Sequence, residues 1–367
     1  DVQLRLRFHT GPVRHTVNVG LDYQHTRAER LIGNGTAAPI NTRNPRASDG
    51  LTRTPAFQTD SQRRQQQWGV YVQDQIEAGQ WLAQLGLRHD RVHTNDHILN
   101  LQSGRVQQDS QQRDHKTTYQ AGLMYRASNG LSPYISYATS FEPTTAANRF
   151  GKPFVPTTAK QWEAGLKYQP ETLNALFTAA AFELTRNNVL TKDVRPGADP
   201  SAQIQTGQVR VKGLELEARA DWNERFSTIT SLTWLNPRVS RSNIAAEAGK
   251  VPVGVPRHMA ALWGQYAMLN DRLKLSAGVR HVGSSYADIA NTLKTPSHTL
   301  IDLGAQLDLG HFNNHLRGLN ASLNVHNLTD KQHYSACVAS TATATAKSTT
   351  CFPGSRRSVV LGLNYTW

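Results

Sequence analysis

The sequence predicts an all-β chain that folds as a transmembrane antiparallel up-and-down β-barrel, and three observations predict it. Apolar and polar residues alternate with a period of two along the whole chain, which is typical of strands and not of helices. The alternating segments are joined by connections that are short and long in turn. The mean hydropathy is −0.52, yet 7 Trp, 11 Tyr and 10 Phe are too many for a chain that buries nothing.

The composition excludes a helical membrane protein. None of the 367 residues belongs to a run of about 20 apolar residues. A barrel remains compatible with a 38% hydrophobic content, because only every second residue of its strands faces lipid. We see no linker or second domain, and therefore expect residues 1–367 to form one domain. The chain opens directly on an alternating strand without a signal peptide, so we expect it to be part of a longer protein.

The alternation divides into about fifteen segments, each of strand length. In the last one, Val359, Leu361, Leu363 and Tyr365 share one face, while the other face is mostly small and polar. The predicted strands cover 2–10, 13–26, 66–78, 81–94, 116–127, 131–142, 158–169, 172–188, 204–220, 225–238, 254–267, 272–284, 297–309, 317–328 and 355–367.

The connections alternate in length as they do in outer-membrane barrels, whose short turns face the periplasm and whose long loops face outward. The predicted long connections are 27–65, 95–115, 143–157, 189–203, 239–253, 285–296 and 329–354. Aromatic residues near strand ends favour the aromatic girdles of a barrel over the core of a sandwich. These residues are Trp68, Tyr71, Trp81, Tyr134, Tyr137, Trp162, Tyr168, Trp222, Trp234, Trp263 and Tyr266.

The last fifty residues carry the most specific motif. An Asn-Val-His-Asn-Leu-Thr-Asp segment runs from Asn324 to Asp330 and is followed by Tyr334. A loop that holds both cysteines then leads to Gly354-Ser-Arg-Arg357 and the final aromatic strand. Five further motifs precede it, in the segments 134–143 (YISYATSFEP), 160–168 (KQWEAGLKY), 207–217 (GQVRVKGLELE), 255–259 (VPRHM) and 283–288 (GSSYAD).

Each motif alone is weak, but six in this order, each on a predicted strand or strand end, resemble the TonB-dependent siderophore receptors. The cysteine pair resembles their ferric-hydroxamate, ferrichrome-type branch. The resemblance implies a barrel of 22 strands that surrounds an N-terminal plug. We therefore expect the chain to be the C-terminal portion of such a barrel, with about fifteen of the 22 strands, and without the plug and the first strands.

The resemblance also implies a function. Such a receptor lies in the outer membrane of a Gram-negative bacterium, among lipopolysaccharide, and takes up a ferric siderophore, here of the hydroxamate type. Uptake is energised by the TonB complex, which contacts the N-terminal part that we expect to be absent. The resemblance implies no enzyme activity, no catalytic residue, no resident metal or cofactor, because iron travels as a chelate, and no nucleic-acid partner.

Cys337 and Cys351 fall within one predicted external loop, with thirteen residues between them. Outside the cytosol such a pair is expected to be oxidised. A disulfide that closes a loop this short contributes about 3 kcal/mol in the chain-entropy model. The alternative to a disulfide is two free thiols. A metal site is not favoured, because no Cys-x-x-Cys motif lies nearby.

Three aromatic residues are candidates for ligand binding, because a chelate with an apolar rim is held by aromatic side chains in the lumen. Phe141 matches the aromatic of the Ser-Phe-Glu-Pro motif, near which the ferrichrome-type pocket of the resembled family uses an aromatic. Tyr286 and Phe352 are further candidates, and loop packing is the alternative role for all three. Residues 338–350 contain no aromatic residue, which departs from the ferrichrome-type pattern and favours another hydroxamate or a different chelate.

Several charged residues invite a more specific role. Glu215 and Glu217 share one strand face, which by analogy is the lumen, where we expect them either to meet Arg210, Lys212 or the plug, or to be merely solvated. The net charge of +13 is spread over the chain rather than gathered on a helix, so it indicates the anionic bacterial surface more than nucleic acid.

Two smaller features have plain structural interpretations. His93 and His97 leave a predicted strand for a loop, and two histidines fall short of the three or four ligands of a usual metal site. Gly165 and Gly213 lie in predicted strands, where glycine marks a bend or a close approach.

Other functions remain open from the sequence. A TonB-dependent receptor for haem, cobalamin or a sugar is the nearest alternative, and a passive porin would be a different class. A barrel hydrolase would need a lumen Ser, His or Asp, and none stands out.

Overall fold

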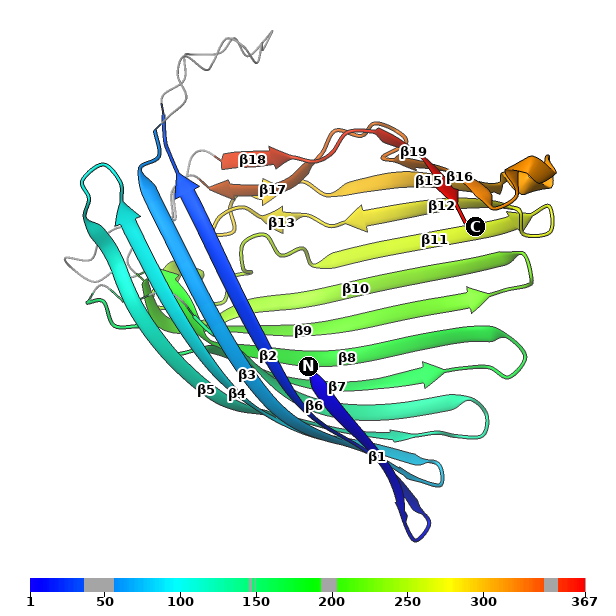
Figure 1. The fold of residues 1–367 in the computed structure, drawn as a ribbon, viewed down its shortest axis with the longest axis horizontal. Coiled ribbons are helices and arrows are strands. Elements are labelled where there is room, and N and C mark those ends of the chain that lie inside the picture. Colours follow the sequence, from blue (N-terminus) through cyan, green and yellow to red (C-terminus); the bar gives the residue numbers. More distant parts are fainter. Residues whose placement is uncertain (36–55, 145–146, 149, 193–202, 340–348, 367) are drawn as a thin grey trace.

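The computed structural model describes residues 1–35, 56–144, 147–148, 150–192, 203–339 and 349–366. Fifteen antiparallel strands form one sheet whose order follows the chain (Figure 1). They are β1 (Val2–Thr10), β2 (Val13–Ile32), β3 (Thr59–Ala78), β4 (Trp81–Asn100), β5 (Val106–Tyr125), β6 (Leu131–Glu142), β7 (Thr157–Tyr168), β8 (Asn174–Lys192), β9 (Gln203–Asp221), β10 (Phe226–Arg241), β11 (His258–Met268), β12 (Leu273–Val282), β15 (His298–Asp308), β16 (Leu319–His326) and β19 (Ser358–Tyr365).

Smaller elements lie in the connections. Two hairpins pair β13 (Ser285–Tyr286) with β14 (Lys294–Thr295) and β17 (Tyr334–Ala339) with β18 (Thr349–Pro353). The helices are single 3-10 turns, η2 (Ala245–Glu247), η3 (Leu309–His311) and η4 (Asn314–Leu316). Within the described ranges, no helix is long and apolar enough to cross a bilayer.

The predicted all-β, up-and-down antiparallel sheet is confirmed, and each of the fifteen predicted strands has a counterpart. The predicted long connection over 95–115 is wrong, because β4 continues to Asn100 and β5 begins at Val106. Their backbones stay paired from Asn95 opposite Gln111 up to this link. Both faces of the strands are mostly polar there, so the apolar alternation ends before the strands do.

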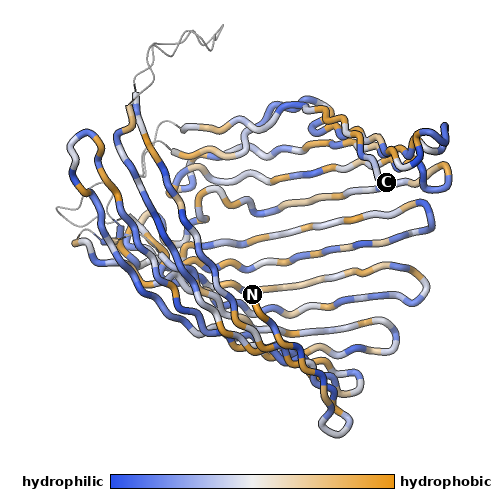
Figure 2. The backbone as a smooth tube through the Cα atoms, viewed as in Figure 1, coloured by the Kyte–Doolittle hydropathy of each residue, from blue (hydrophilic) through white to orange (hydrophobic). Residues whose placement is uncertain are grey.

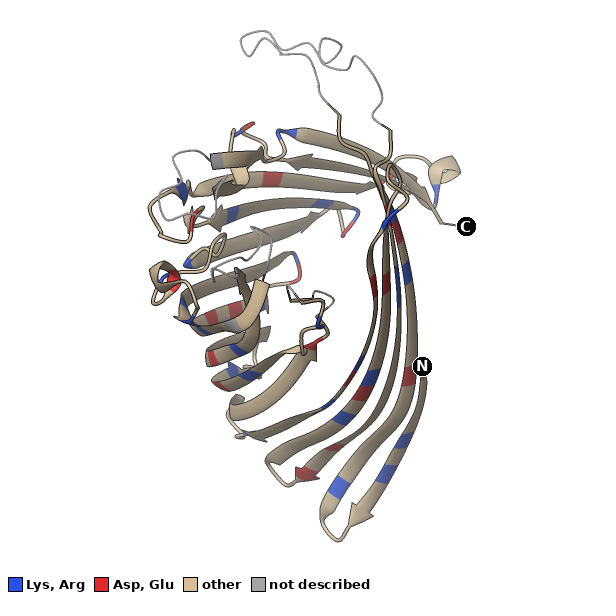
Figure 3. Cartoon of the chain, turned by 90° about the vertical axis from the view of Figure 1, so that its left-hand side faces the viewer, with Lys and Arg blue, Asp and Glu red and all other residues tan. Residues whose placement is uncertain are grey.

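The sheet has two edges, β1 and β19, each paired on one side only in the described structure. One seam inside the sheet is short, since β5 pairs with β6 over only five positions, Gln120–Met124. Just beyond, the Thr139 hydroxyl accepts a hydrogen bond from the N–H of Tyr119 (2.9 Å) and donates one to its carbonyl (3.2 Å). The strands from β2 to β5 accordingly lean away from the later ones (Figures 1 and 3).

Strand alternation and register give the sheet an apolar outer face and a polar inner face, and the alternation shows along the backbone in Figure 2. In a membrane barrel the apolar face meets lipid. Outer-face residues exposed in the isolated chain include Leu21, Val70, Leu87, Leu123, Ile135, Leu166, Leu262, Val279, Ile301 and Leu361.

The predicted girdle is only partly right. Seven of its residues share the outer face, namely Trp68, Trp81, Tyr137, Trp162, Tyr168, Trp234 and Tyr266. Trp222 lies in the turn between β9 and β10. By register Tyr71, Tyr134 and Trp263 instead face inward, and therefore cannot anchor the barrel to the lipid interface.

Inner-face aromatic rings lie over glycines on the neighbouring strand. Tyr134 covers Gly165 directly opposite, and Phe182 covers Gly213. A Cβ at Gly165 would come within 2.5 Å of the Tyr134 ring, and one at Gly213 within 2.3 Å of the Phe182 ring. Close approach therefore explains both glycines, as the sequence predicts.

The same geometry makes Gly278 a test of inner-face packing. A Cβ there would lie 1.9 Å from the Trp263 ring, so Gly278→Ala forces the ring or the strand to move. We expect a loss of about 1–3 kcal/mol in the free energy of unfolding, as for other overpacked sites. Gly122→Ala is the matched control, because its Cβ would find no atom nearer than 3.7 Å. Equal urea-unfolding midpoints for the two variants would contradict the packing argument.

Candidate functional site

Three long connections meet at one end of the sheet and are tied together by hydrogen bonds. Asn291, between β12 and β15, donates to the carbonyl of Val251 (2.9 Å) and accepts from its N–H (2.8 Å). The N–H of Cys337, in the last loop, donates to the Thr295 hydroxyl (3.1 Å). We call the described residues of these linked connections, 242–257, 283–297, 327–339 and 349–357, the loop rim.

A buried carboxylate organises the middle connection of the loop rim. Asp288 is 2% exposed and accepts from the N–H groups of Thr292 and Leu293 and from the Thr292 hydroxyl, each at 2.8 Å. Burial alone would raise the pKa of Asp288, but these hydrogen bonds lower it below its ordinary value. The carboxylate stays ionised and fixes the turn that presents β13 and β14.

The candidate ligand residues Tyr286 and Phe352 both lie in the loop rim. Tyr286 is half-buried in β13, and the Lys294 ammonium lies 5.5 Å from its ring centroid. Phe352 is 55% exposed in β18, opposite Ala336. Ligand binding by Tyr286 and Phe352 stays a prediction, and their positions in the loop rim are compatible with it.

Phe141, the first candidate, lies elsewhere. Its register partner in β7 is Thr158, and it shares the outer face with Ile135 and Tyr137. Tyr134, on the inner face of the same strand, points to the opposite side. Ligand binding by Phe141 thus stays a prediction that this orientation does not favour.

Cys337 and Cys351 form the expected disulfide within the last loop. They are directly opposite each other in the β17–β18 hairpin, with a Cα–Cα distance of 4.0 Å. The low-complexity stretch that they enclose lies mostly in 340–348, outside the described residues.

The Asn-Leu-Thr-Asp motif closes the base of the last loop. Asn327 adopts a left-handed φ of 50°, and its side-chain amide donates to the carbonyls of Lys331 (2.9 Å) and Ser355 (3.1 Å). Its N–H donates to Asp302 (2.9 Å). The start and the end of the loop are thereby joined.

A second link runs between Asp330 and Arg356. The Arg356 Nε donates to the Asp330 carboxylate at 2.8 Å, and the Arg357 N–H donates to it at 3.0 Å. These two hydrogen bonds, that from Arg356 above all, hold the pKa of Asp330 well below its ordinary value.

A cavity of about 550 Å³ opens beside this loop base. The His333 ring lies 4.5 Å from that of His298, between centroids, and covers Gly354. Several of the lining residues, Gln332 among them, carry side-chain hydrogen-bond donors, so the cavity offers contacts to an oxygen-rich ligand. The other donors are Ser297, Lys331, His333, Tyr334 and Arg356.

Carboxylates gather on the inner face farther along the sheet. The Tyr134 hydroxyl donates to Glu163 (2.8 Å), and register puts Glu215 and Glu217 on the same face. The expected contact with Arg210 and Lys212 is wrong, because those even-numbered residues of β9 face outward. Both lie 3.4 Å from Glu183, a residue that the sequence did not single out.

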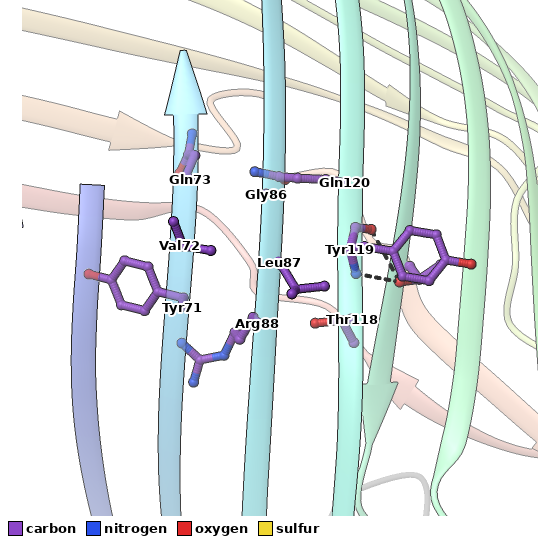
Figure 4. Close-up of a pocket in the computed structure, with 10 residues that line it drawn as sticks. Tyr71, Val72, Gln73, Gly86, Leu87, Arg88, Thr118, Tyr119 and Gln120 are labelled. Carbon is purple, nitrogen blue, oxygen red and sulfur yellow. Dashed lines mark hydrogen bonds between the residues drawn. The ribbon is translucent and has the colours of Figure 1, made fainter. Parts of the chain in front are cut away.

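A charged network on the inner face of β2–β4 was also not predicted. Arg88 donates to Asp22 (2.6 and 3.0 Å) and to Asp90 (2.6 and 2.8 Å), and its guanidinium lies 5.9 Å from the Tyr71 ring centroid. Tyr71 and Arg88 border a 270 Å³ pocket (Figure 4). Asp90 is 1% exposed and also accepts from Gln67. Projecting each strand onto its two faces would have found this cluster.

His93 and His97 lie within β4 rather than in a loop, on its outer face. In the part of the chain that the structure describes, no group of three or more His, Cys, Asp or Glu side chains could hold a metal ion.

The Asp330–Arg356 link predicts a pH response of the loop base. A depressed pKa means that the link is intact above the unfolded pKa of about 4 and is lost only as the pH falls through the lower folded value. We expect amide-exchange protection of residues 354–358 to stay constant from pH 8 to pH 5, and to fall at all these pH values in Asp330→Ala. Asp271→Asn, in a turn at the opposite end of the sheet, is the control. Unchanged protection in Asp330→Ala would contradict this role.

Comparison with known proteins places this geometry in a family. A family model described as "TonB dependent receptor-like, beta-barrel" matches residues 1–328. A ferrioxamine receptor of Yersinia enterocolitica is 33% identical over 372 residues, which cover 100% of this chain and 50% of that protein. The ferrichrome outer membrane transporter/phage receptor of Escherichia coli K12 is 33% identical, over 98% of this chain and 47% of that protein.

Solved structures show the same fold. The siderophore receptor PiuA of Acinetobacter baumannii superposes with a TM-score of 0.75 at 23% identity, over 99% of this chain and 55% of that one. The ferric-catecholate import receptor Fiu of E. coli K12, in its closed form, superposes with a TM-score of 0.79 at 21% identity. The match covers 99% of this chain and 53% of that one.

The chain spans about half the length of the curated relatives it matches. The first of those relatives is named as a receptor and the second as an outer membrane transporter and phage receptor. The chain belongs to the TonB-dependent receptor β-barrel family of the bacterial outer membrane.

Proposed function

We propose that residues 1–367 are the C-terminal portion, as one domain, of the barrel of a receptor that takes up ferric siderophores of the hydroxamate type. The observation that carries this proposal is the 33% identity, over the whole chain, to proteins named as ferrioxamine receptors and as a ferrichrome transporter. Ferrioxamine and ferrichrome are both ferric hydroxamates. No covalent chemistry is required, so the proposed protein is a transporter without a resident cofactor, and iron is its cargo.

The open edges of the sheet support a larger barrel. All nine residues of β1 are exposed, and β19 pairs only with β16. In lipid, such edges leave backbone groups without hydrogen bonds at a cost of several kcal/mol each. We infer that further strands join them and that a plug fills the lumen, where Glu163, Glu215 and Glu217 offer it a negative surface. Contact with the TonB complex would lie outside this chain.

The loop rim is the proposed place of ligand capture. Its hydrogen bonds preorganise it, and the donors around the 550 Å³ cavity are suited to the oxygen atoms of a chelate. Tyr286 and Phe352 supply apolar contacts for the organic rim of that chelate. The cysteine loop contains no aromatic residue, which favours ferrioxamine over ferrichrome.

Lipopolysaccharide is the second proposed partner, because cationic side chains lie on the outer face of the sheet. The alternatives of haem, cobalamin or a sugar as ligand, and of a passive porin, have no specific observation in their favour.

The ligand proposal is tested by titrating the purified full-length receptor with ferrioxamine B and with ferrichrome, using quenching of intrinsic fluorescence. We expect ferrioxamine B to bind more tightly, and Phe352→Ala to weaken its binding about tenfold, or 1.4 kcal/mol. Phe312→Ala is the control, because this ring is also exposed (65%) but lies at the other end of the sheet. A receptor that binds neither chelate would refute the proposed substrate class.

A further inference from the structure

The outer face of the sheet is hollowed between β10 and β16. The hollow has a volume of about 490 Å³. By register its floor is formed by three small residues, Gly264 opposite Ala277, and Ala305 on the next strand of the sheet. Larger apolar and aromatic residues surround them, namely Phe226, Tyr266, Leu275, Leu303, Leu323 and Val325. We call this hollow the apolar groove.

The glycine on the floor of the apolar groove is not explained by packing within the described chain. On the inner face, glycines lie under aromatic rings, and a Cβ at Gly278 would come within 1.9 Å of the Trp263 ring. A Cβ at Gly264 would find no described atom nearer than 3.6 Å, and that atom belongs to the Phe226 ring. The space above Gly264 is therefore open toward the bilayer, where a molecule outside the chain can fill it.

The apolar groove lies in the half of the membrane band that is nearer the periplasm. Short turns face the periplasm, and the short turn between β11 and β12 spans 269–272. Gly264 and Ala277 each lie five residues from this turn. At about 3.3 Å per residue and a tilt of about 40°, this corresponds to about 13 Å along the barrel axis, or about half of a 25 Å lipid-facing band. Tyr266, a girdle residue on the outer face, borders the groove on its periplasmic side.

The lining of the apolar groove disfavours polar occupants. None of its outer-face residues is charged, and the Tyr266 hydroxyl is the only polar side-chain group among these lining residues. Gln265 and Ser276 also border the groove, but register places them on the inner face. A buried water molecule needs about two to four polar partners, which this lining does not offer. Hydrocarbon is therefore the chemistry that fits the groove.

We propose that the apolar groove binds one acyl chain of a phospholipid in the periplasmic leaflet. The groove is continuous with the lipid-facing outer face, so a bilayer lipid reaches it directly. Its depth places it beside acyl chains rather than headgroups, and its lining offers no charge to a headgroup. The site is separate from the loop rim and does not depend on the proposed siderophore.

Recognition of the chain depends on shape rather than on the hydrophobic effect. Lipid tails are as apolar as leucine side chains, so moving a chain from the bilayer into the groove gains no hydrophobic free energy. An unfilled hollow loses the dispersion contacts of its lining, whereas a flexible chain that fills it restores them. We therefore expect the groove to bind an acyl chain whatever its headgroup.

The experiment uses the purified full-length receptor, delipidated in detergent, and measures by native mass spectrometry the lipids that it binds. The probes are phosphatidylethanolamine, phosphatidylglycerol with the same chains, and lysophosphatidylethanolamine, which has one chain. We expect the native receptor to bind one molecule of each most tightly, with affinities within about twofold of one another. We expect Ala277→Leu/Ala305→Leu, which fills the groove, to weaken this binding about fivefold or more, which corresponds to about 1 kcal/mol.

Two further variants complete the test. Ala277→Leu alone changes an exposed residue and should weaken binding about twofold, so it replaces the double variant if that one does not fold. Ala121→Leu is the matched control, because Ala121 is also exposed on the outer face, on β5, but does not line the groove. It should bind lipid as the native receptor does. Thermal unfolding followed by circular dichroism checks that each variant is folded.

Four results would overturn the proposal. Unchanged binding in the groove-filling variants would show that no chain occupies the groove. Equal weakening in Ala121→Leu would show that the effect is general to the outer face. A preference of more than about tenfold between the two headgroups would assign the binding to a headgroup. A dimer of the native receptor that Ala277→Leu/Ala305→Leu abolishes would assign the groove to a second copy of the chain.

Discussion

Backbone hydrogen bonding is the constraint on which the rest of this structure depends. In hydrocarbon an unpaired N–H or C=O costs several kcal/mol, so strands that turn an apolar face to lipid must pair with their neighbours. The fifteen strands pair in chain order, the arrangement that short turns impose. Where the β5–β6 ladder ends early, the Thr139 hydroxyl replaces a backbone partner for both polar groups of Tyr119. At the edges of the described sheet, β1 and β19 each have one side without a paired strand.

Once the strands are paired, the sequence determines the structure by placing each side chain on the inner or the outer face of the sheet. On the inner face, glycines opposite large rings let neighbouring strands carry bulky groups without strain, as at Gly165 and Gly278. Charges on that face find partners across strands. Arg88 binds Asp22 and Asp90, and Arg280 binds Asp302 at 2.7 Å, so the polar wall is held by charge-assisted hydrogen bonds rather than by an apolar core.

The fold could be predicted from sequence because period-two alternation and turn residues are local signals. The prediction failed where that signal stops, as at residues 95–115, whose strands are mostly polar on both faces. It also failed for the charged residues of β9, because neighbouring residues of a strand face opposite sides of the sheet. Odd and even positions of β9 separate Glu215 from Arg210, which face opposite sides of the sheet. The loop rim was beyond such reasoning, because contacts such as Asn291 to Val251 join residues forty positions apart in irregular backbone.

The same sorting by face explains a net charge that looks scattered along the chain. Many of the carboxylates lie on the inner face, where they neutralise Arg63, Arg88 and Arg280. On the outer face of β3–β5, Arg64, Arg91 and Arg113 are exposed and make no ion pair within the described part of the chain. Exposed guanidinium groups such as these stay charged in contact with water and counter-ions and need no partner in the protein.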